Sequence, residues 1–292
     1  MIAITQVIIH YGFIIQLKLP HTLNDLQLII LILASVFIAA AGYIINDIND
    51  VEIDKINKPK KLYITKNFSE KTAYNLYLLL NIIGVGLGFL LANLINKPGF
   101  ALSFVLISAL LYSYASFLKR ILLVGHIVVS VLVAATIFVV ILFDLVPVYA
   151  VYYNVLATPL SVLRDYAIFA FLLNLLREIV KSIEDIKGDK NGGIKSLPIL
   201  LGRTRTSVIT SVLALVYIAV LIAYIYEFLY GNLFFVIYLL LGVCFPLLFF
   251  ATKAWTAETK KEFTKLSIVI KCVMLAGVLS LGVLTLTIKY AA

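Results

Sequence analysis

Long apolar segments, separated by short polar ones, run along almost the whole chain. About 20 apolar residues span a bilayer as a helix, and the sequence contains nine candidate spans of this kind. They cover residues 1–17, 25–46, 71–95, 98–117, 121–143, 163–184, 206–228, 232–252 and 265–289. No run alternates polar and apolar residues at the ten-residue scale of a barrel strand. The pattern therefore predicts an all-α membrane protein, a bundle of about nine transmembrane helices.

Composition supports this class and leaves the chain undivided. The 292 residues are 63% hydrophobic and only 13% charged, whereas soluble proteins are nearer half apolar and a quarter charged. No Pro/Gly/Ser-rich linker interrupts the sequence, so residues 1–292 are expected to form a single multi-pass domain. The spans are almost free of charge away from their ends, which argues against a transporter with ionisable groups at the bilayer midplane. Glycines 84, 86 and 88 form a stripe typical of close helix packing.

The net charge of +9 reflects the placement of basic residues rather than a nucleic-acid partner. Of the 24 basic residues, 20 lie on the connections after spans 2, 4, 6 and 8. Basic residues concentrate in cytoplasmic loops. The distribution thus predicts a cytoplasmic N-terminus and an outside C-terminus. It also places both acidic motifs, described below, on the cytoplasmic side. We expect the membrane to be a bacterial cytoplasmic membrane. The three histidines are scattered without ligand spacing, so no transition-metal site is predicted.

Two acidic motifs interrupt the apolar pattern, each at the end of a candidate span. They are, in order, Asn46-Asp47-x-x-Asp50-x-x-x-Asp54 and Asp185-x-x-x-Asp189. At about 3.6 residues per turn, the carboxylates of each motif lie on one face of a helix. A charge near hydrocarbon costs on the order of 2.5–3.5 kcal/mol, so packing does not explain them. They require a compensating cation.

The two motifs share their spacing at a separation of 135 residues. Asp50 corresponds to Asp185 and Asp54 to Asp189, while Ser182 takes the place of Asp47. Each motif also begins one of the two long connections. This predicts two related four-helix halves with spans 2 and 6 as counterparts. A pseudo-symmetric bundle would bring the motifs face to face across a central cavity open to the cytoplasmic side.

A diphosphate held by Mg²⁺ is the ligand that two facing carboxylate sets predict. Magnesium prefers oxygen ligands and usually binds through one or two carboxylates plus substrate phosphates. Basic side chains would neutralise the remaining charge, which stabilises a departing diphosphate. The basic candidates are Lys58, Lys61, Lys119, Arg120, Arg177 and Lys181. Departure of an allylic diphosphate leaves a carbocation that ring faces can shield, and the aromatic candidates are Tyr43, Tyr112, Tyr114 and Phe117.

Together the motifs resemble those of the UbiA superfamily of intramembrane prenyltransferases. Three further segments carry the resemblance: DKINKP, YSYASFLKR and GDKNGGIKSLPILLG. The likeness runs from about residue 25 to residue 205. It implies Mg²⁺ dependence and transfer of a polyprenyl chain from its diphosphate to a lipophilic or aromatic acceptor.

The resemblance also implies roles for individual residues. The expected metal ligands are Asp47, Asp50, Asp54, Asp185 and Asp189. The expected catalytic residues are four of these, Asp50, Asp54, Asp185 and Asp189. The expected diphosphate-binding residues are Asn46, Lys58, Lys119, Arg177 and Lys181.

The acceptor stays open among several readings. The sequence around both motifs is most similar to that of the geranylgeranylglyceryl-phosphate geranylgeranyltransferase branch, in which a glycerol hydroxyl attacks the allylic carbon. The 4-hydroxybenzoate polyprenyltransferase branch, with ring prenylation in quinone biosynthesis, is the alternative. From a different class, a membrane carrier or a non-catalytic binder of lipid diphosphates remains. Membrane lipids are expected around the bundle, with no nucleic acid and no obligate protein partner.

Overall fold

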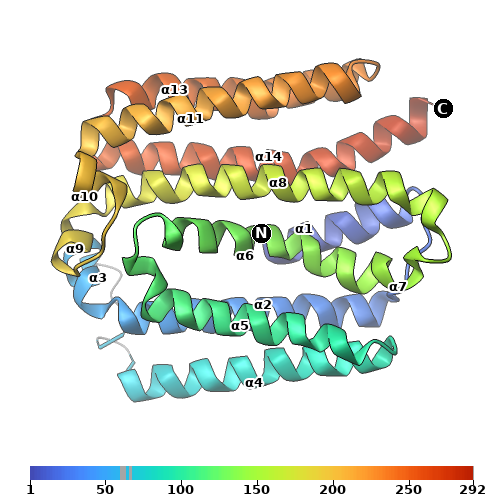
Figure 1. Ribbon diagram of the computed structural model, residues 1–292, viewed down its shortest axis with the longest axis horizontal. Helices are drawn as coiled ribbons and strands as arrows, with labels where there is room; N and C mark the ends of the chain where they lie inside the picture. Colours follow the sequence, from blue (N-terminus) through green and yellow to red (C-terminus); the bar gives the residue numbers. More distant parts are fainter. Residues whose placement is uncertain (60–63, 66–67, 292) are drawn as a thin grey trace.

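The protein is a bundle of helices lying side by side along one long axis (Figure 1). The structure is a computed structural model that describes residues 1–59, 64–65 and 68–291. Its elements in chain order are α1 (Ile2–Val7), η1 (Ile8–Ile15), α2 (Asp25–Asn49), α3 (Val51–Asn57), α4 (Glu70–Leu94), η3 (Pro98–Phe100), α5 (Ala101–Ser116), η4 (Leu118–Arg120), α6 (Val124–Val140), η5 (Ile141–Leu145), α7 (Val146–Tyr149), α8 (Tyr153–Glu184), α9 (Ile186–Asn191), α10 (Leu197–Leu201), α11 (Arg203–Tyr224), η6 (Ile225–Leu229), α12 (Leu233–Leu239), η7 (Leu240–Cys244), α13 (Phe245–Thr256) and α14 (Lys260–Ala291).

Within the described residues, eight helical segments are long and apolar enough to cross a membrane. They are α2, α4, η3–α5, α6–η5–α7, α8, α11–η6, α12–η7–α13 and α14. Each coincides with one of the last eight predicted spans. The main difference is α8, which begins at Tyr153 rather than near residue 163, because the helix continues through Pro159 and through a polar pair, Arg164 and Asp165.

The first predicted span is shorter than expected. α1 and η1 have 6 and 8 residues, about two thirds of the length that a crossing helix needs. In Figure 1 the N-terminus lies midway along the bundle, beside α6 and α8, and not at the end that carries the acidic motifs. The helix over residues 2–15 is therefore shorter than the full span predicted over residues 1–17.

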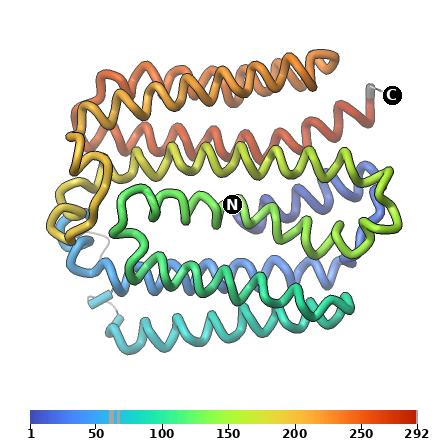
Figure 2. The backbone as a smooth tube through the Cα atoms, viewed as in Figure 1, coloured from blue at the N-terminus to red at the C-terminus, as the bar shows by residue number. Residues whose placement is uncertain are grey.

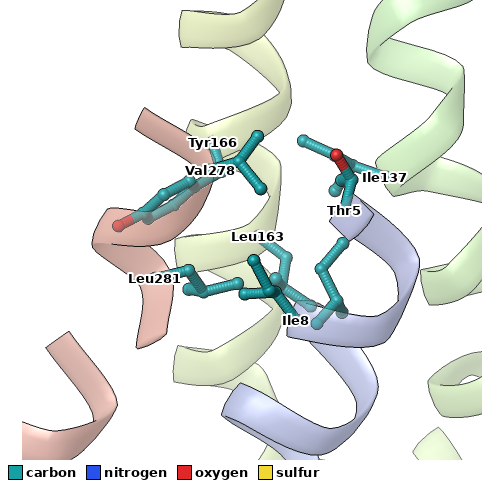
Figure 3. A pocket seen from close by; sticks show the side chains of 8 residues that line it. Thr5, Ile8, Ile137, Leu163, Tyr166, Val278 and Leu281 are labelled. Atoms are coloured by element: carbon teal, nitrogen blue, oxygen red, sulfur yellow. The ribbon is translucent and has the colours of Figure 1, made fainter. Parts of the chain in front are cut away.

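This short helix is packed into the middle of the bundle. Figure 3 shows Thr5 and Ile8 facing Ile137 of α6, Leu163 of α8 and Leu281 of α14. The space between these side chains is about 10 Å³, room for roughly one water molecule. The contact is therefore packing and not a ligand site.

Two apolar clusters form the core, and both include residues of α8. One cluster joins residues of η1, α2, α4, α5 and α6 to Leu156 and Leu163 of α8. The other joins α11, α13 and α14 to Leu173 and Leu176 of the same helix. α8 is thus shared by the two clusters, as is α14, which contributes Leu281 to the first and Ile270 to the second.

Close helix approach in the first half depends on glycine. A Cβ at Gly84 would lie 2.7 Å from the Ile38 side chain of α2, and one at Gly88 would overlap the ring of Phe104 of α5. Gly86 has open space beside it. The predicted packing role is therefore confirmed for Gly84 and Gly88.

A buried ion pair at the far end of the bundle was not predicted. His10 Nδ1 lies 2.6 Å from Asp144 Oδ2, and both side chains are almost fully buried. The other carboxylate oxygen of Asp144 accepts from the backbone N–H groups of Thr22 and Leu23. The Asp144 carboxylate is fully used in tying η5 to the chain before α2, so the pair is structural. The sequence separates its members by 134 residues, and for that reason the pattern missed it.

The short helices α3, α9 and α10 gather at one end of the bundle (Figures 1 and 2). α3 packs against α9, and α10 contacts α8 and α9. The connections that carry the two acidic motifs thus meet at a single end.

Candidate active site

Both acidic motifs break their helix in the same way. α2 ends at Asn49 and α8 at Glu184, and the next residue, Asp50 or Asp185, takes nearly identical angles (φ −101°, ψ 6° and φ −99°, ψ 8°). A new short helix starts directly afterwards. The break turns the last aspartate of each motif, Asp54 or Asp189, back over the end of the bundle. The local geometry thus repeats with the spacing found in the sequence, while the relation between whole four-helix halves stays a prediction.

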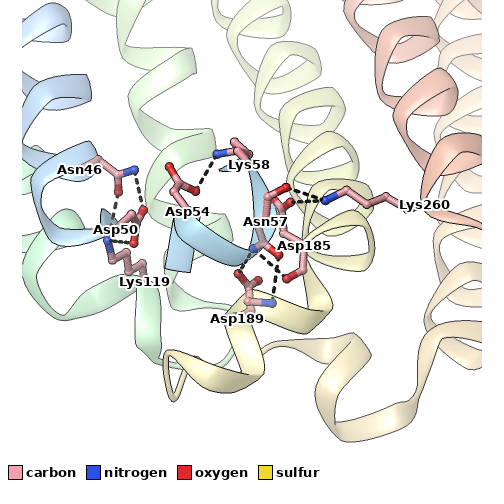
Figure 4. A network of polar contacts seen from close by, with 10 residues as sticks. Asn46, Asp50, Asp54, Asn57, Lys58, Lys119, Asp185, Asp189 and Lys260 are labelled. Carbon is pink, nitrogen blue, oxygen red and sulfur yellow. Dashed lines mark hydrogen bonds and ion pairs between the residues drawn. The ribbon is translucent and has the colours of Figure 1, made fainter. Parts of the chain in front are cut away.

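Asn57 joins the two motifs (Figure 4). Its Nδ2 donates to the backbone carbonyl of Asp185 at 3.0 Å and lies 3.4 Å from Asp189 Oδ1, and its Oδ1 accepts from the Gly188 N–H at 3.0 Å. A Cβ at position 188 would lie only 2.5 Å from the Asn57 amide, so glycine is required for this approach. In the sequence, Asn57 stands out only as part of the segment DKINKP. Its contacts with the second motif depend on the packing of α3 against α9, which no local pattern predicts.

The carboxylates of the first motif have internal cationic partners. Lys119 Nζ donates to Asp50 Oδ1 at 2.6 Å, and its side chain is only 6% exposed. Asn46 Nδ2 donates to the other oxygen of Asp50 at 2.8 Å. Lys58 Nζ lies 3.2 Å from Asp54 Oδ1. These contacts join predicted residues in two groups, Asn46, Asp50 and Lys119 in one and Asp54 with Lys58 in the other.

Lys119 is held in place by the backbone around it. It lies in the short η4 turn after α5, and a Cβ at Gly125 would lie 2.8 Å from Lys119 Cα. Leu123, just before α6, has a positive φ of 63°, which is uncommon for a non-glycine residue. The tight turn between α5 and α6 therefore carries Lys119 under the end of α2.

The carboxylates of the second motif are less well compensated. Among the described residues, the nearest cation to Asp185 is Lys260 of α14, at 3.8 Å, and Lys260 also donates to the Asn57 carbonyl at 2.9 Å. Burial, followed by the charges of Asp185 and Asp50, raises the pKa of Asp189 to about 7. Burial also raises the pKa of Asp185. Lys260 was expected only as a topology residue; its contact depends on the position of α14, which no local pattern gives.

A cavity of about 670 Å³ opens beside these motifs and runs between the helices. Its polar end is lined by Asn46, Asp47, Lys58, Arg177, Glu178 and Lys181. The rest of the lining is largely apolar and comes from α2, α5, α6, α8, α11, α12 and α14. The volume is typical of a ligand site. Asp47, Arg177 and Lys181 thus line the cavity, whereas Asp50, Asp54, Asp185 and Asp189 are not part of its lining.

The remaining candidates are placed less uniformly. Arg177 bonds to the neighbouring Glu178, and Lys181 has Glu178, Asp185 and Asp50 as its charged neighbours. Tyr43 and Tyr114 line the cavity, whereas Tyr112 and Phe117 do not. The predicted candidate Lys61 lies outside the described residues.

The donor set fits a magnesium ion shared with a ligand rather than a closed protein cage. Over the described ranges, no three Asp, Glu, His or Cys side chains surround a common point suited to a metal. Mg²⁺ needs only one or two carboxylates when substrate phosphates supply the other oxygens. Burial and the neighbouring carboxylates of Asp185 and Asp50 raise the pKa of Asp189, so a bound cation would stabilise its charged form. Asp185 and Asp189 are therefore fitting ligands, and Asp47 and Asp50 lie on the opposing motif.

The chain belongs to the UbiA prenyltransferase family, which it matches over residues 7–283. It is similar to the digeranylgeranylglyceryl phosphate synthase of Sulfolobus acidocaldarius (36% identical over 179 residues, 59% of this chain and 56% of that protein). The synthase of Pyrococcus horikoshii is 35% identical over 186 residues, 63% of this chain and 60% of that protein. The match thus covers less than two thirds of the length of either relative.

Solved structures share the fold. A UbiA homolog from Aeropyrum pernix has a TM-score of 0.68 at 19% identity, covering 94% of this chain and 96% of that one. A digeranylgeranylglyceryl phosphate synthase structure gives 0.63 at 24% identity, with 97% and 92% covered. A UbiA homolog from Archaeoglobus fulgidus, bound to DMAPP and Mg²⁺, gives 0.59 at 15% identity, with 96% and 94% covered.

These matches confirm the predicted family and the all-α membrane fold. The relatives named above are archaeal, so the expected bacterial source has no support. The alternative in quinone biosynthesis also has none.

Proposed function

We propose that the protein transfers a polyprenyl group from its diphosphate, with Mg²⁺, to the hydroxyl of a geranylgeranylglyceryl phosphate-type lipid. One observation carries the proposal: Asn57 joins two carboxylate motifs at the polar end of a long apolar cavity. The similarity to digeranylgeranylglyceryl phosphate synthases supports the choice of acceptor. Residues 1–292 would act as one domain, because α8 contributes to both apolar clusters.

The basic side chains at the polar end would bind the departing group. Lys58, Arg177 and Lys181 line the cavity there, so they are positioned to neutralise phosphate oxygens. Bound Mg²⁺, held by Asp185 and Asp189 and facing Asp47 and Asp50, would supply Lewis-acid stabilisation of the diphosphate. Lys119 and Asn46 would orient Asp50.

The transfer itself exchanges one carbon–oxygen bond for another. The bond between the allylic carbon and the diphosphate oxygen breaks, and the electron pair leaves with the diphosphate. The acceptor hydroxyl then supplies an electron pair to the allylic carbon, and its proton, strongly acidic once the new bond forms, passes to the released diphosphate or to water. Tyr43 and Tyr114 line the same part of the cavity, and their ring faces would shield the positive carbon.

The positive-inside pattern supports a cytoplasmic position for this end of the bundle. Lys58, Lys119, Lys260 and the basic residues of α9 all lie at the end that carries the acidic motifs. Water-soluble diphosphate and Mg²⁺ would then enter from the cytoplasm, while the lipid tails lie among the helices.

Turnover by the purified protein tests the proposal. The protein would be supplied with a panel of polyprenyl diphosphates and acceptors, and products would be identified by mass spectrometry. We expect Mg²⁺-dependent prenyl transfer that Asp50→Ala abolishes. Asp25→Ala is the matched control, because Asp25 begins the same helix at the opposite end and contacts Tyr11. Absence of any Mg²⁺-dependent product, or equal loss in both variants, would overturn the proposal.

A further inference from the structure

Lys271 is a charged residue inside a membrane-spanning helix, with no partner among the described residues. It lies in α14 within the segment Lys260–Tyr290, contributes to the cavity lining and has an exposed side chain. Across the described residues it forms no hydrogen bond or ion pair, unlike Lys119, Lys58 and Lys260. A charge within a bilayer is costly and generally faces a functional cavity. An anion brought by a ligand is the missing partner.

The packing of α14 on α8 fixes the depth of Lys271. Thr264 Oγ1 donates to Glu184 Oε1 at 2.8 Å, and the hydroxyls of Ser280 and Tyr166 lie 2.7 Å apart. The two helices are therefore antiparallel and in register. Seven residues separate Thr264 from Lys271, and the same seven residues back from Glu184 lead to Arg177. Lys271 thus lies about 10 Å in from the end of the bundle, level with Arg177.

The cavity extends to two sides of α8 from this level. On one side its apolar lining comes from α2, α5 and α6, including Ile38, Leu111 and Val133. On the other side it comes from α11, α12, η7 and α14; we call this side the C-terminal arm, defined by Leu221, Leu239, Val243, Met274 and Leu284. Lys271 and Met274 lie one turn apart on α14, so Lys271 stands at the polar end of the C-terminal arm.

The acidic motifs and their cations account for one anion only. Lys58, Lys181 and Arg177 face the diphosphate site from α8 and the segment after α3, whereas Lys271 faces the cavity from α14. Two phosphate groups held at one point would repel each other, since like charges a few ångströms apart interact strongly outside bulk water. A reaction between two anionic lipids therefore needs a second cation at a separate place.

We propose that Lys271 binds the phosphate of the acceptor lipid and that the C-terminal arm holds the acceptor's hydrocarbon chain. This assignment rests on the proposed function and adds to it: the acceptor is a lipid phosphate with a long apolar tail. The donor chain then occupies the side lined by α2, α5 and α6. The acceptor hydroxyl is delivered toward the allylic carbon from the side of α14.

The test separates the two substrates kinetically. The full chain would be placed in nanodiscs of zwitterionic phosphatidylcholine, which contain no anionic lipid. Geranylgeranyl diphosphate and geranylgeranylglyceryl phosphate would be varied in turn. Lys271→Met should raise KM for the acceptor by about tenfold or more, the usual effect of removing a bond to a charged group. KM for the diphosphate should be unchanged, and Lys271→Arg should keep most of the acceptor affinity.

Two controls give the experiment its meaning. Lys265→Met removes an exposed lysine from the same helix outside the cavity lining and should leave both KM values unchanged. With geranylgeranylglycerol, which lacks the phosphate, wild type and Lys271→Met should behave alike. An unchanged acceptor KM in Lys271→Met, or an equal rise for the donor, would overturn the assignment.

Failure of the proposed function would give a different result. If wild type transfers no prenyl group to any acceptor, the proposed function is wrong. Direct binding of geranylgeranylglyceryl phosphate would then decide the role of Lys271: weaker binding in Lys271→Met than in wild type supports it, and equal binding rejects it.

Discussion

The two acidic motifs have the same backbone but different charge balance. Asp50 and Asp185 adopt the same angles, 135 residues apart, between a long helix and a short one. In the first motif Lys119 holds Asp50 at 2.6 Å. In the second, the nearest described cation to Asp185 is 3.8 Å away and the pKa of Asp189 is raised to about 7. Among the described residues, Asp50 and Asp54 of the first motif thus have a lysine within 3.2 Å, whereas neither carboxylate of the second motif has one so close.

This difference assigns separate tasks to similar residues. A carboxylate already paired with a buried lysine contributes to the fold of the apo protein. A carboxylate without such a partner is destabilising until a metal binds, because burying an uncompensated charge is unfavourable. The first motif therefore supports the site, and the second provides the stronger demand for Mg²⁺.

The largest expected effect comes from removing one charge in each motif. Asp50→Asn and Asp189→Asn should each lower kcat/KM by about 10²–10³-fold, the range seen when a charge-stabilising group is lost. Their effects on the apo protein should differ. Asp50→Asn leaves Lys119 without its counter-charge and should lower the free energy of unfolding by on the order of 3 kcal/mol. Asp189→Asn should leave it unchanged or raise it at pH 8.

Thermal unfolding without Mg²⁺, alongside steady-state rates, checks this split. Asp25→Asn, at the far end of α2, is the control for both measurements. Equal destabilisation by Asp50→Asn and Asp189→Asn would show that the motifs do not differ in charge balance.

The next effect concerns the contact that joins the motifs. Gly188→Ala would place a Cβ 2.5 Å from the Asn57 amide, so the two must move apart. Overpacking of this kind lowers the free energy of unfolding by about 1–3 kcal/mol. Because Asp185 and Asp189 would shift relative to Asp50, we also expect kcat/KM to fall by the factor that corresponds to this free energy. Gly99→Ala, where the Cβ meets open space, should have no effect. Full activity in Gly188→Ala would mean that Asn57 does not set the spacing of the motifs.

Sequence periodicity and motif spacing predict much of this molecule, for identifiable reasons. Transmembrane helices are long and apolar, so eight of nine spans were predicted. The aspartates recur at helical spacing near basic residues, and this pattern predicted the motif residues and Lys119 as parts of the site. The misses are contacts between distant segments. Asn57, Lys260 and Lys271 each depend on which helix packs beside which, and His10 with Asp144 depends on the far end of the bundle. The shortness of the first helix was also missed, because residues 1–17 are mostly apolar despite Gln6, His10 and Gln16.

The smallest effect we predict is a pH dependence that belongs to the second motif. The pKa of Asp189 is raised from an unfolded value of about 4 to about 7 by burial and by Asp185 and Asp50. The contribution of the Asp189 carboxyl to the stability of the Mg²⁺-free protein is present below pH 4 and is lost as pH rises through 7.

Mg²⁺ competes with the proton on Asp189, so the affinity for Mg²⁺ should instead rise with pH, by about tenfold between pH 6 and pH 8. Calorimetric Mg²⁺ binding in the presence of pyrophosphate measures the second trend, and apo unfolding temperatures measure the first. Both slopes should be smaller in Asp189→Asn, whose amide does not titrate. Identical slopes in wild type and variant would place the titrating group elsewhere and remove the distinction between a neutralised motif and one that awaits its cation.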